Sequence, residues 1–536
     1  MRKHFVSLAL LYSLVALSTA GAQSASELHF CLHSEPKTFD PLKVEDEASL
    51  TVRYLTGGVL MRVNRKTQNI EPELAESWKI SKDARQITLK LRSGIRFSDG
   101  TPFSSEDVAF TVQKLMDPEL HSPTGDAFRS GPGQVVTHII SPTQVSIAFP
   151  APVIGMDRLF DQVAVLSAHS ARKEMAVLGP FMVAEYKAGA SLHLIRNPNY
   201  WKHDAQGRAL PYLDGILLDI QANRDVELLR FQRGELDLIN SLDSELYEKL
   251  AATSPSVVHD AGPSLDSEQM WFNQVAKAPI ADYKKAWFRS THFRLAISGA
   301  INRDDLGRIV FRGHARPAVG VISPANRFWF NSQLKPTPYS PDAALKQLAS
   351  DGFRMDQGVL HDAQGHAVEF SIITNSGSKY RERMAVLMQQ DLQKIGIKVS
   401  VVTLDFPALI ERIAQTFDYD AALLGLTNTD LDPNGQMNVW LSSSENHQWN
   451  PQQKTPETPW EAELDQLMRA QASTADPLKR KKSFDRVQEI VLEQAPFLYL
   501  VTKNSLSAAS TRVHGADPVA VNPQTFWNAE LLTVQK

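Results

Sequence analysis

Residues 71–111 read EPELAESWKISKDARQITLKLRSGIRFSDGTPFSSEDVAFT and predict a strand, a tight turn and a helix, in that order. Apolar and polar side chains alternate over Ile87–Leu91, which is the pattern of a half-exposed strand. Ser98–Thr101 is a turn, because its Asp can cap the turn and its Gly accepts a positive φ. Ser104 or Ser105 can then cap a helix. The stretch indicates a fold that mixes sheets with helices.

A second block, residues 178–201, reads LGPFMVAEYKAGASLHLIRNPNYW. Gly179–Phe181 interrupts the chain before a strand, and Ser191–Arg196 again alternates between apolar and polar residues. Asn197–Asn199, with a central proline, ends that strand. Neither block contains the parts of an enzyme site.

The clearest alternation of strand and helix lies in the second half of the chain. Val368–Ile372 alternates as a strand, and Asn375 or Ser376 can cap the helix that follows. Gly396 stands where a helix-ending glycine belongs, and Ile397–Val402 returns as a strand. Such an alternation predicts an α/β fold.

The N-terminus has the composition of a secretory signal peptide. Arg2 and Lys3 are followed by a mostly apolar run, Phe5–Leu17, and by an A-x-A cleavage site at Ala20–Ala22. A membrane anchor is the alternative, but the run is shorter than the 20 or so apolar residues that a span needs. We expect cleavage after Ala22 and an exported, periplasmic protein.

Charge and cysteine content exclude several classes of function. The net charge is −4, and it becomes −6 when the signal segment is removed with Arg2 and Lys3. No basic block stands out, which argues against nucleic acid or an anionic membrane as a partner. Cys31 is the single cysteine, so an internal disulfide is impossible, and we expect it to be a small buried side chain. Residues 23–536 are enough for two or more domains.

Motifs of catalysis are missing from the sequence. It has no G-x-S-x-G elbow, no G-x-x-x-x-G-K-[ST] phosphate loop and no H-E-x-x-H zinc helix, and its 15 histidines are scattered. We therefore predict no catalytic residue, no cofactor and no metal. A catalytic triad is defined by geometry, so an exported hydrolase stays an alternative, with the polar stretch 433–459 as a long loop that could form its lid.

Six shorter sequence blocks, four of them inside the two stretches quoted above, occur in order along the chain. They are PELAESW (72–78), LRSGIRFSDGTPFSSEDVAFT (91–111), GPF (179–181), RNPNYW (196–201), GELDL (234–238) and FRLAISGAINRDDL (293–306). Together, and behind a signal peptide, they strongly resemble the extracellular solute-binding proteins of family 5, which feed oligopeptide, dipeptide and nickel ABC importers. The resemblance implies an α/β, two-lobed, periplasmic-binding-protein-like clamp with an inserted subdomain and mixed sheets flanked by helices.

The resemblance also implies a division of the chain. We expect a signal peptide at 1–22, lobe I at 23–58, an inserted subdomain at 59–174, the second segment of lobe I at 175–262, lobe II at 263–492 and a return to lobe I at 493–536. The lobes of such a clamp close over the ligand by hinge motion.

The binding residues implied by the resemblance cluster in the segment LGLTNTDLDP, residues 424–433. In the family's peptide binders an aspartate before a D-P step pairs with the ligand α-ammonium, and Asp430 matches it. Asn428 and Leu426 belong to the same segment, and Leu426 stands where the family often has tryptophan. Asp430 and Asp432 could instead be turn residues, and for Asp432 we favour the turn.

Two aromatic residues are further candidates for the cleft. Trp329 and Trp440 could line it, and burial in the core is the alternative for both.

We thus predict a monomeric periplasmic receptor for peptides that serves an inner-membrane permease and ATPase. An oligosaccharide or metal chelate as ligand, and a sensor rather than an importer, are the alternatives.

Overall fold

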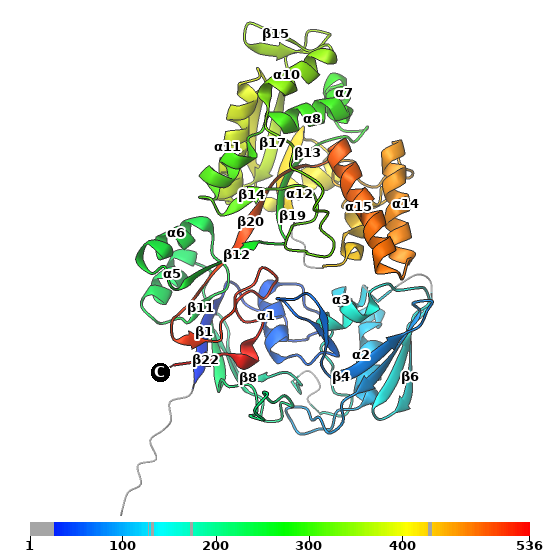
Figure 1. Ribbon diagram of the computed structural model, residues 1–536, viewed down its shortest axis with the longest axis vertical. Helices are drawn as coiled ribbons and strands as arrows, with labels where there is room; N and C mark the ends of the chain where they lie inside the picture. The colour runs from blue at the N-terminus through cyan, green and yellow to red at the C-terminus, as the bar shows by residue number, and fades with distance from the viewer. Residues whose placement is uncertain (1–25, 127, 130–132, 172–174, 427–430, 536) are drawn as a thin grey trace, which may run out of the picture.

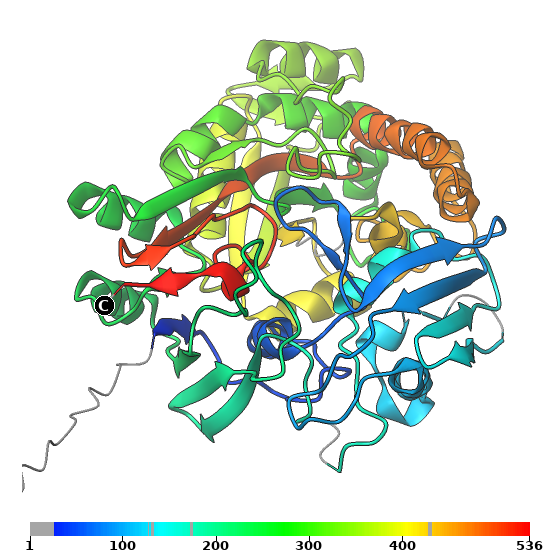
Figure 2. The same ribbon diagram turned by 60° about the horizontal axis from the view of Figure 1, so that its bottom comes forward.

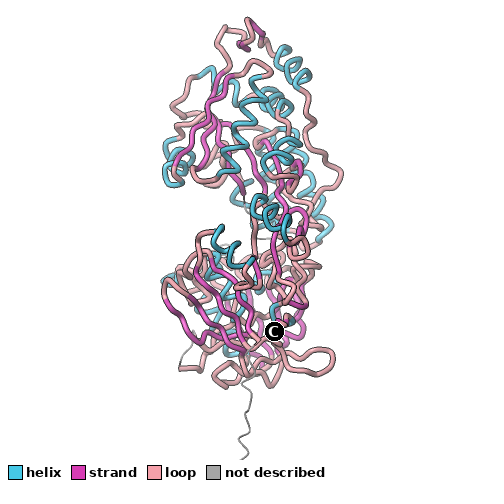
Figure 3. The backbone as a smooth tube through the Cα atoms, turned by 90° about the vertical axis from the view of Figure 1, so that its left-hand side faces the viewer, coloured by secondary structure: helices cyan, strands magenta, loops and turns pink. Residues whose placement is uncertain are grey.

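The computed structural model describes residues 26–126, 128–129, 133–171, 175–426 and 431–535. It has two lobes stacked along its long axis (Figure 1), and a side view shows the same two bodies joined at one side (Figure 3). Lobe I, the lower body in Figure 1, contains both ends of the described chain. Lobe II is the upper body, and it contains most of the helices.

Lobe I has two four-stranded sheets. The first has the order β1-β10-β9-β8, in which β1 and β10 are parallel, and the second has the order β4-β5-β7-β6 and is antiparallel. Their bounds are β1 (Glu27–Leu32), β8 (Phe181–Lys187), β9 (Ser191–Arg196), β10 (Gly215–Ile220), β4 (Ala75–Ile80), β5 (Gln86–Leu91), β6 (Val136–Ser141) and β7 (Gln144–Ala148). Two small ribbons pair β2 (Met61–Val63) with β3 (Ile70–Pro72), and β21 (Val513–His514) with β22 (Thr533–Val534).

The longer helices of lobe I begin at side-chain caps. Asp46 accepts a hydrogen bond from the Ser49 amide at the start of α1, and Ser104 forms a capping box with Asp107 at the start of α2. The helices are α1 (Glu47–Thr56), α2 (Ser105–Leu115), η1 (Pro118–Leu120), α3 (Pro123–Asp126), α4 (Met156–Leu159), η2 (Phe160–Gln162), α5 (Arg224–Gln232), α6 (Ser244–Thr253) and η6 (Ala529–Leu531).

The largest sheet has eight strands and belongs mainly to lobe II. Its order is β11-β20-β13-β19-β17-β18, with β12 and β14 also paired to β20, and β18, β17 and β19 are parallel neighbours. The bounds are β11 (Leu238–Ile239), β12 (Val258–Pro263), β13 (Ser267–Phe272), β14 (Ala315–Pro317), β17 (Glu369–Asn375), β18 (Lys398–Leu404), β19 (Ala421–Leu426) and β20 (Leu498–Ala509). A separate ribbon pairs β15 (Arg354–Asp356) with β16 (Val359–His361).

Helices flank this sheet in lobe II, and α14 and α15 pack side by side (Figure 1). The helices of lobe II are α7 (Asp282–Arg289), α8 (Thr291–Ala300), α9 (Arg303–Asp305), η3 (Leu306–Val310), α10 (Pro341–Ser350), α11 (Lys379–Gln393), α12 (Phe406–Glu411), η4 (Arg412–Thr416), η5 (Pro433–Gln436), α13 (Met437–Trp440), α14 (Pro459–Ser473) and α15 (Pro477–Gln494).

Each body is filled by its own apolar clusters. One cluster of lobe I lies under the β4-β5-β7-β6 sheet, a second lies on the β1 sheet, and a smaller one includes Cys31 and joins α5 to α6. Two large clusters fill lobe II on the two sides of β13 and β19. Cys31 is 5% exposed, which confirms the expected burial, and burial raises the pKa of its thiol to about 12.

The chain returns to lobe I at its end. Seen from below, the red C-terminal strands lie beside the dark blue β1 (Figure 2), and the Ser26 hydroxyl donates to the Val534 carbonyl. None of the helices in the described ranges combines the length and apolar composition needed to cross a bilayer.

The predicted strands and turns are confirmed in the two opening blocks. β5, β9 and the Ser104 cap lie where the alternation and the serines place them, and Gly100 has a φ of +87°. One prediction about helix starts is wrong. The helix after β17 begins at Lys379, so Ser378 is its N-cap residue, rather than Asn375 or Ser376.

The stretch 433–459 is also not a continuous loop. Asp432 caps η5, which α13 continues to Trp440, and only residues 441–458 are irregular.

Candidate functional site

Three parallel strands of lobe II end at one edge of the sheet, and that edge lies next to lobe I. Asn375 at the end of β17 is in register with Leu404 at the end of β18, and Leu426 at the end of β19 pairs with Ser267. Ser267 follows directly on the segment 263–266, where the chain crosses from β12 to β13. In α/β sheets ligands bind at the carboxyl ends of strands, so this edge is the candidate site.

A cluster of opposite charges lies at this edge. Arg381, in the first turn of α11, places Nε 2.8 Å from Glu268 Oε2, and its Nη1 donates to Asn375 Oδ1 at 2.9 Å. Lys503 Nζ is 3.7 Å from Glu268 Oε1 and 3.8 Å from Asp266 Oδ2. Glu268 is 1% exposed, whereas the Lys503 side chain is 31% exposed. Two cations thus surround one buried carboxylate.

The charges in this cluster support each other. Burial would lower the pKa of Lys503, but the Glu268 carboxylate, the Tyr380 hydroxyl and Asp266 raise it above its ordinary value. The pKa of Arg381 is raised in the same way, since Glu268 outweighs the effect of burial. Both side chains therefore stay cationic at every physiological pH.

Gly425 makes room for the ion pair. A Cβ at this position would lie 2.5 Å from Arg381 Nη2 and 2.7 Å from Glu268 Oε1, closer than real Cβ contacts. The glycine of the LGL sequence is thus explained by the close approach of two side chains.

Of the predicted binding residues in 424–433, the structure describes Leu426 and Asp432. Leu426 ends β19 and is half-buried, while Asn428 and Asp430 lie outside the described residues. Asp432 accepts a hydrogen bond from the Asn434 amide, as the turn interpretation expects, and forms two bonds of 2.6 and 2.9 Å with the Arg480 guanidinium. Its carboxylate is therefore held in a buried ion pair.

Both predicted aromatic candidates lie in the core of lobe II, the alternative given for them. Trp329 is 4% exposed and has the Arg480 guanidinium 4.9 Å from its ring centre. Trp440 is 0% exposed, and its Nε1 donates to Gln436 Oε1 at 3.1 Å. In this lobe arrangement Trp440 presents no surface to a ligand, and ligand contact by either tryptophan stays a prediction.

Sequence reasoning missed Glu268, Arg381, Lys503 and the aromatic residue Phe406. Phe406 begins α12, directly beyond the carboxyl end of β18, and is 57% exposed. A signal was available for two of them: Arg381 and Phe406 both follow within nine residues of a predicted strand end. Glu268 and Lys503 lie on β13 and β20, and only the fold brings them together.

The segment after residue 430 connects the candidate site with lobe I. Leu431 packs with Val63 and Val521 of lobe I and with Leu265 in one apolar cluster. Asn434 Nδ2 donates to the Ile154 carbonyl at 3.4 Å. The polypeptide that carries the predicted ligand contacts therefore also carries contacts between the lobes.

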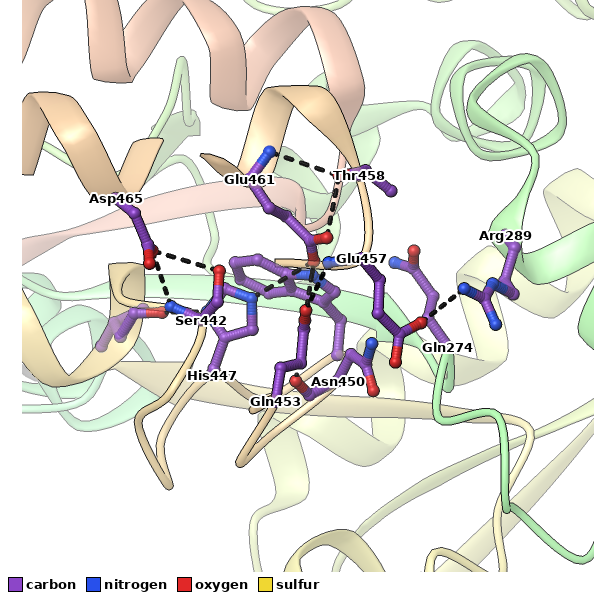
Figure 4. Close-up of polar contacts among 12 residues, drawn as sticks. Gln274, Arg289, Ser442, His447, Asn450, Gln453, Glu457, Thr458, Glu461 and Asp465 are labelled. Atoms are coloured by element: carbon purple, nitrogen blue, oxygen red, sulfur yellow. Dashed lines mark hydrogen bonds and ion pairs between the residues drawn. The ribbon is translucent and has the colours of Figure 1, made fainter. Parts of the chain in front are cut away.

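The polar loop at 441–458 is anchored by one buried carboxylate. Glu461 of α14 accepts hydrogen bonds from Trp449 Nε1 at 3.1 Å and Gln453 Nε2 at 2.9 Å on one oxygen, and from Thr458 on the other (Figure 4). His447 Nε2 lies 3.4 Å from the same carboxylate, and Asp465 holds Ser442. The loop is therefore built into lobe II by its own polar side chains.

Two hollows lie away from this edge. One of about 30 Å³ lies beside α1 in lobe I, and one of about 530 Å³ lies between the polar loop and α14. Neither is lined by the charged residues at the carboxyl edge. Within the described ranges, no three His, Cys, Asp or Glu side chains are grouped so that they could hold one metal ion.

Comparison with known proteins agrees with the fold. The profile of the bacterial extracellular solute-binding proteins, family 5 (middle region), matches residues 69–448. A probable ABC transporter-binding protein of Deinococcus radiodurans is 27% identical, over 89% of this chain and 87% of its own.

Two solved structures share the fold at lower identity. The ABC transporter substrate-binding protein CtaP from Listeria monocytogenes has a TM-score of 0.79 at 22% identity, over 96% of this chain and 100% of its own. The oligopeptide-binding protein AppA from Bacillus subtilis, in complex with a nonapeptide, has a TM-score of 0.70 at 22% identity, over 95% and 99%. The family profile covers more than half of the chain, and so this chain belongs to family 5 of the bacterial extracellular solute-binding proteins.

Proposed function

We propose that this protein is the periplasmic solute-binding component of an ABC importer and that it captures peptides between its lobes. The main support is the charge cluster at the carboxyl ends of the parallel strands of lobe II. There Arg381 and Lys503 surround the buried Glu268. The predicted anion, Asp430, follows Leu426 by four residues in the sequence. Such a site offers groups of both signs to a ligand with an ammonium and a carboxylate.

The chemistry suits a peptide with free termini. An ammonium that leaves water needs a paired anion, and Asp430 supplies it. The partly exposed ammonium of Lys503 supplies a cation to a peptide carboxylate, while Glu268 remains paired with Arg381. Backbone groups at strand ends can bond the peptide main chain, which suits peptides of varied sequence. The nonapeptide held by AppA supports this ligand class for the fold.

The remaining parts of the proposal follow from family membership. The protein is a receptor without catalytic residues, it is exported by a signal peptide cleaved after Ala22, and it works as a monomer that delivers its ligand to a permease and ATPase complex. The division into 23–58, 59–174, 175–262, 263–492 and 493–536 is part of the proposal. The separate apolar clusters of the two bodies support it except at the last boundary, since apolar residues of 495–501 pack in the clusters of lobe II.

A thermodynamic cycle tests the role of Asp430. Binding of one peptide and of its N-acetylated form is measured by calorimetry on the wild type and on Asp430→Asn. Acetylation should weaken binding to the wild type by at least tenfold, because it removes the ammonium. In Asp430→Asn acetylation should hardly change the affinity, because the carboxylate that pairs with the peptide ammonium has already been removed. The matched control is Asp418→Asn, because Asp418 is exposed and lies just before the start of β19.

If acetylation weakens peptide binding equally in the wild type and in Asp430→Asn, Asp430 does not pair with the ligand ammonium. If no peptide from a panel of two to nine residues binds, the peptide proposal itself fails. An oligosaccharide or metal chelate would then be the ligand class to test, and a sensor role would be decided by whether a permease is bound.

A further inference from the structure

The lobes are joined by two stretches of extended chain. The first half of β20 pairs with β13 and β14 of lobe II, and its second half pairs with β12 and β11 on the side of lobe I. The second connection is the segment 263–266, between β12 and β13. Any change in the angle between the lobes must bend the chain at these two places.

His314 lies beside both connections. It directly precedes β14, and its carbonyl accepts a hydrogen bond from the Asn504 amide of β20 at 2.8 Å, so its backbone is part of lobe II. Its side chain points the other way. Nε2 is 2.7 Å from Glu248 Oε1 on α6, and Nδ1 is 3.0 Å from Asp260 Oδ2 on β12. Both carboxylates belong to elements that pack in lobe I.

The two contacts cannot both persist when the imidazole loses a proton. An imidazolium donates from both ring nitrogens, whereas a neutral ring has one donor and one lone pair. The lone pair would then face a carboxylate less than 3.1 Å away. Histidine side chains commonly change their charge between about pH 5 and 8, the range that an exported protein meets.

We infer that His314 is a pH-sensitive brace of the interlobe hinge, which ties α6 and β12 to lobe II when protonated and loses one tie when neutral. Low pH should therefore favour the lobe arrangement seen here, and high pH should loosen it.

Two groups that face His314, Asp260 and Tyr247, each keep one charge state. Burial would raise the pKa of Asp260, but hydrogen bonds from Asn504 Nδ2, His314 and the Gly262 amide bring the pKa below its ordinary value, so this carboxylate stays charged. On α6, Tyr247 packs on the imidazole with ring centres 4.6 Å apart, and its own pKa is raised by burial, which keeps it neutral.

A second interlobe ion pair on α6 does not titrate in this range. Arg383 of α11 reaches Glu245 at 3.8 Å, and arginine stays charged at all relevant pH values.

Distance measurements between spin labels test the brace without any ligand. Labels are placed at Gln206→Cys in lobe I and Gln364→Cys in lobe II, both exposed, and the native Cys31 is buried. The interlobe distance distribution is recorded from pH 5.5 to 8.5 on the full chain. We expect it to shift or broaden as the pH rises.

Three substitutions in this background make the test specific. His314→Gln and Glu248→Gln should each remove most of the pH-dependent change, and Glu248→Gln does so from the surface of a helix, where it leaves the core intact. His292→Gln removes an exposed histidine paired with Asp351 inside lobe II, and it should leave the response unchanged. A wild type without a pH response, or a response that survives both His314→Gln and Glu248→Gln, would overturn the inference.

Discussion

At the scale of single residues, the molecule depends on a few buried charges that find partners far along the chain. Asp432 is the clearest case: the sequence suggested a turn residue before a proline, and it does cap η5. Its partner Arg480 lies on α15, and neither spacing nor periodicity indicates that pairing. Local roles such as caps and turns can thus be predicted from neighbours in sequence, whereas buried ion pairs depend on the completed fold.

Removing one charge of this pair should be costly. Asp432→Asn leaves the Arg480 guanidinium, 5% exposed, without its anion, and loss of one member of a buried pair typically costs about 3–5 kcal/mol. We expect the unfolding of lobe II in denaturant to move to clearly lower concentration.

The matched control is Asp485→Asn on the same helix as Arg480. Asp485 pairs with Lys481 near the surface, where such pairs contribute at most about 1 kcal/mol. Equal destabilisation by both substitutions would show that the Asp432–Arg480 pair has no special weight.

At the scale of elements, strands were easier to predict than helix starts and loops. β5 and β9 follow from alternation alone, because one face of each strand is buried, and β17 follows from it although Ile373 on its other face is buried as well. The predicted N-cap of α11 was two or three residues too early. Ser378 occupies the N-cap position after the turn at Gly377, and its side chain makes no capping hydrogen bond. In the stretch 433–459 polar composition hid η5, α13 and the Glu461 anchor, because polar side chains here are buried and paired with each other.

The Glu461 anchor predicts a pH-dependent contribution to stability. Burial would raise the pKa of this carboxyl, but hydrogen bonds from His447, Gln453, Thr458 and Trp449 lower it to about 2. Folding therefore favours the charged form. Its stabilisation is complete above the ordinary pKa of 4.5 and is lost as the pH falls from there towards 2.

Glu461→Gln should accordingly lower the free energy of unfolding by about 2–4 kcal/mol at pH 7, because each pKa unit corresponds to about 1.4 kcal/mol. The difference from the wild type should shrink as unfolding is measured at pH 4 and then pH 3. Glu463→Gln, on the same helix but 45% exposed and paired with Arg486, serves as the control. If Glu461→Gln lowers the free energy of unfolding by the same amount at pH 7 and at pH 3, the charge of Glu461 does not contribute to stability.

At the scale of the whole molecule, the fold class could be predicted and the binding site only in outline. Sequence blocks in the right order indicated the two-lobed clamp, and family membership and structure agree with it. That the segment 424–433 contacts the ligand stays a prediction, and the structure places Leu426 at the edge next to lobe I. The partners Glu268 and Lys503 could not be found, since they come from strands more than 230 residues apart.

Contacts between the lobes should set how often the present arrangement is populated. Leu431 packs against Val63 and Val521 of lobe I, and a buried leucine contributes about 1.5–3 kcal/mol. Leu431→Ala should therefore broaden the distance distribution between labels at Gln206→Cys and Gln364→Cys. Leu478→Ala, which changes a side chain 72% exposed on α15, should leave the distribution unaltered. A narrow, unchanged distribution in Leu431→Ala would show that this cluster does not hold the lobes.

The proposed ligands are peptides, and native mass spectrometry reads the bound ligand itself. Protein purified from its own cells without denaturation is weighed intact, and its ligand is then released by denaturation and sequenced. We expect a mixture of short peptides, with mass differences that correspond to amino-acid residues. A single released species that is a sugar or a metal chelate would refute the peptide assignment.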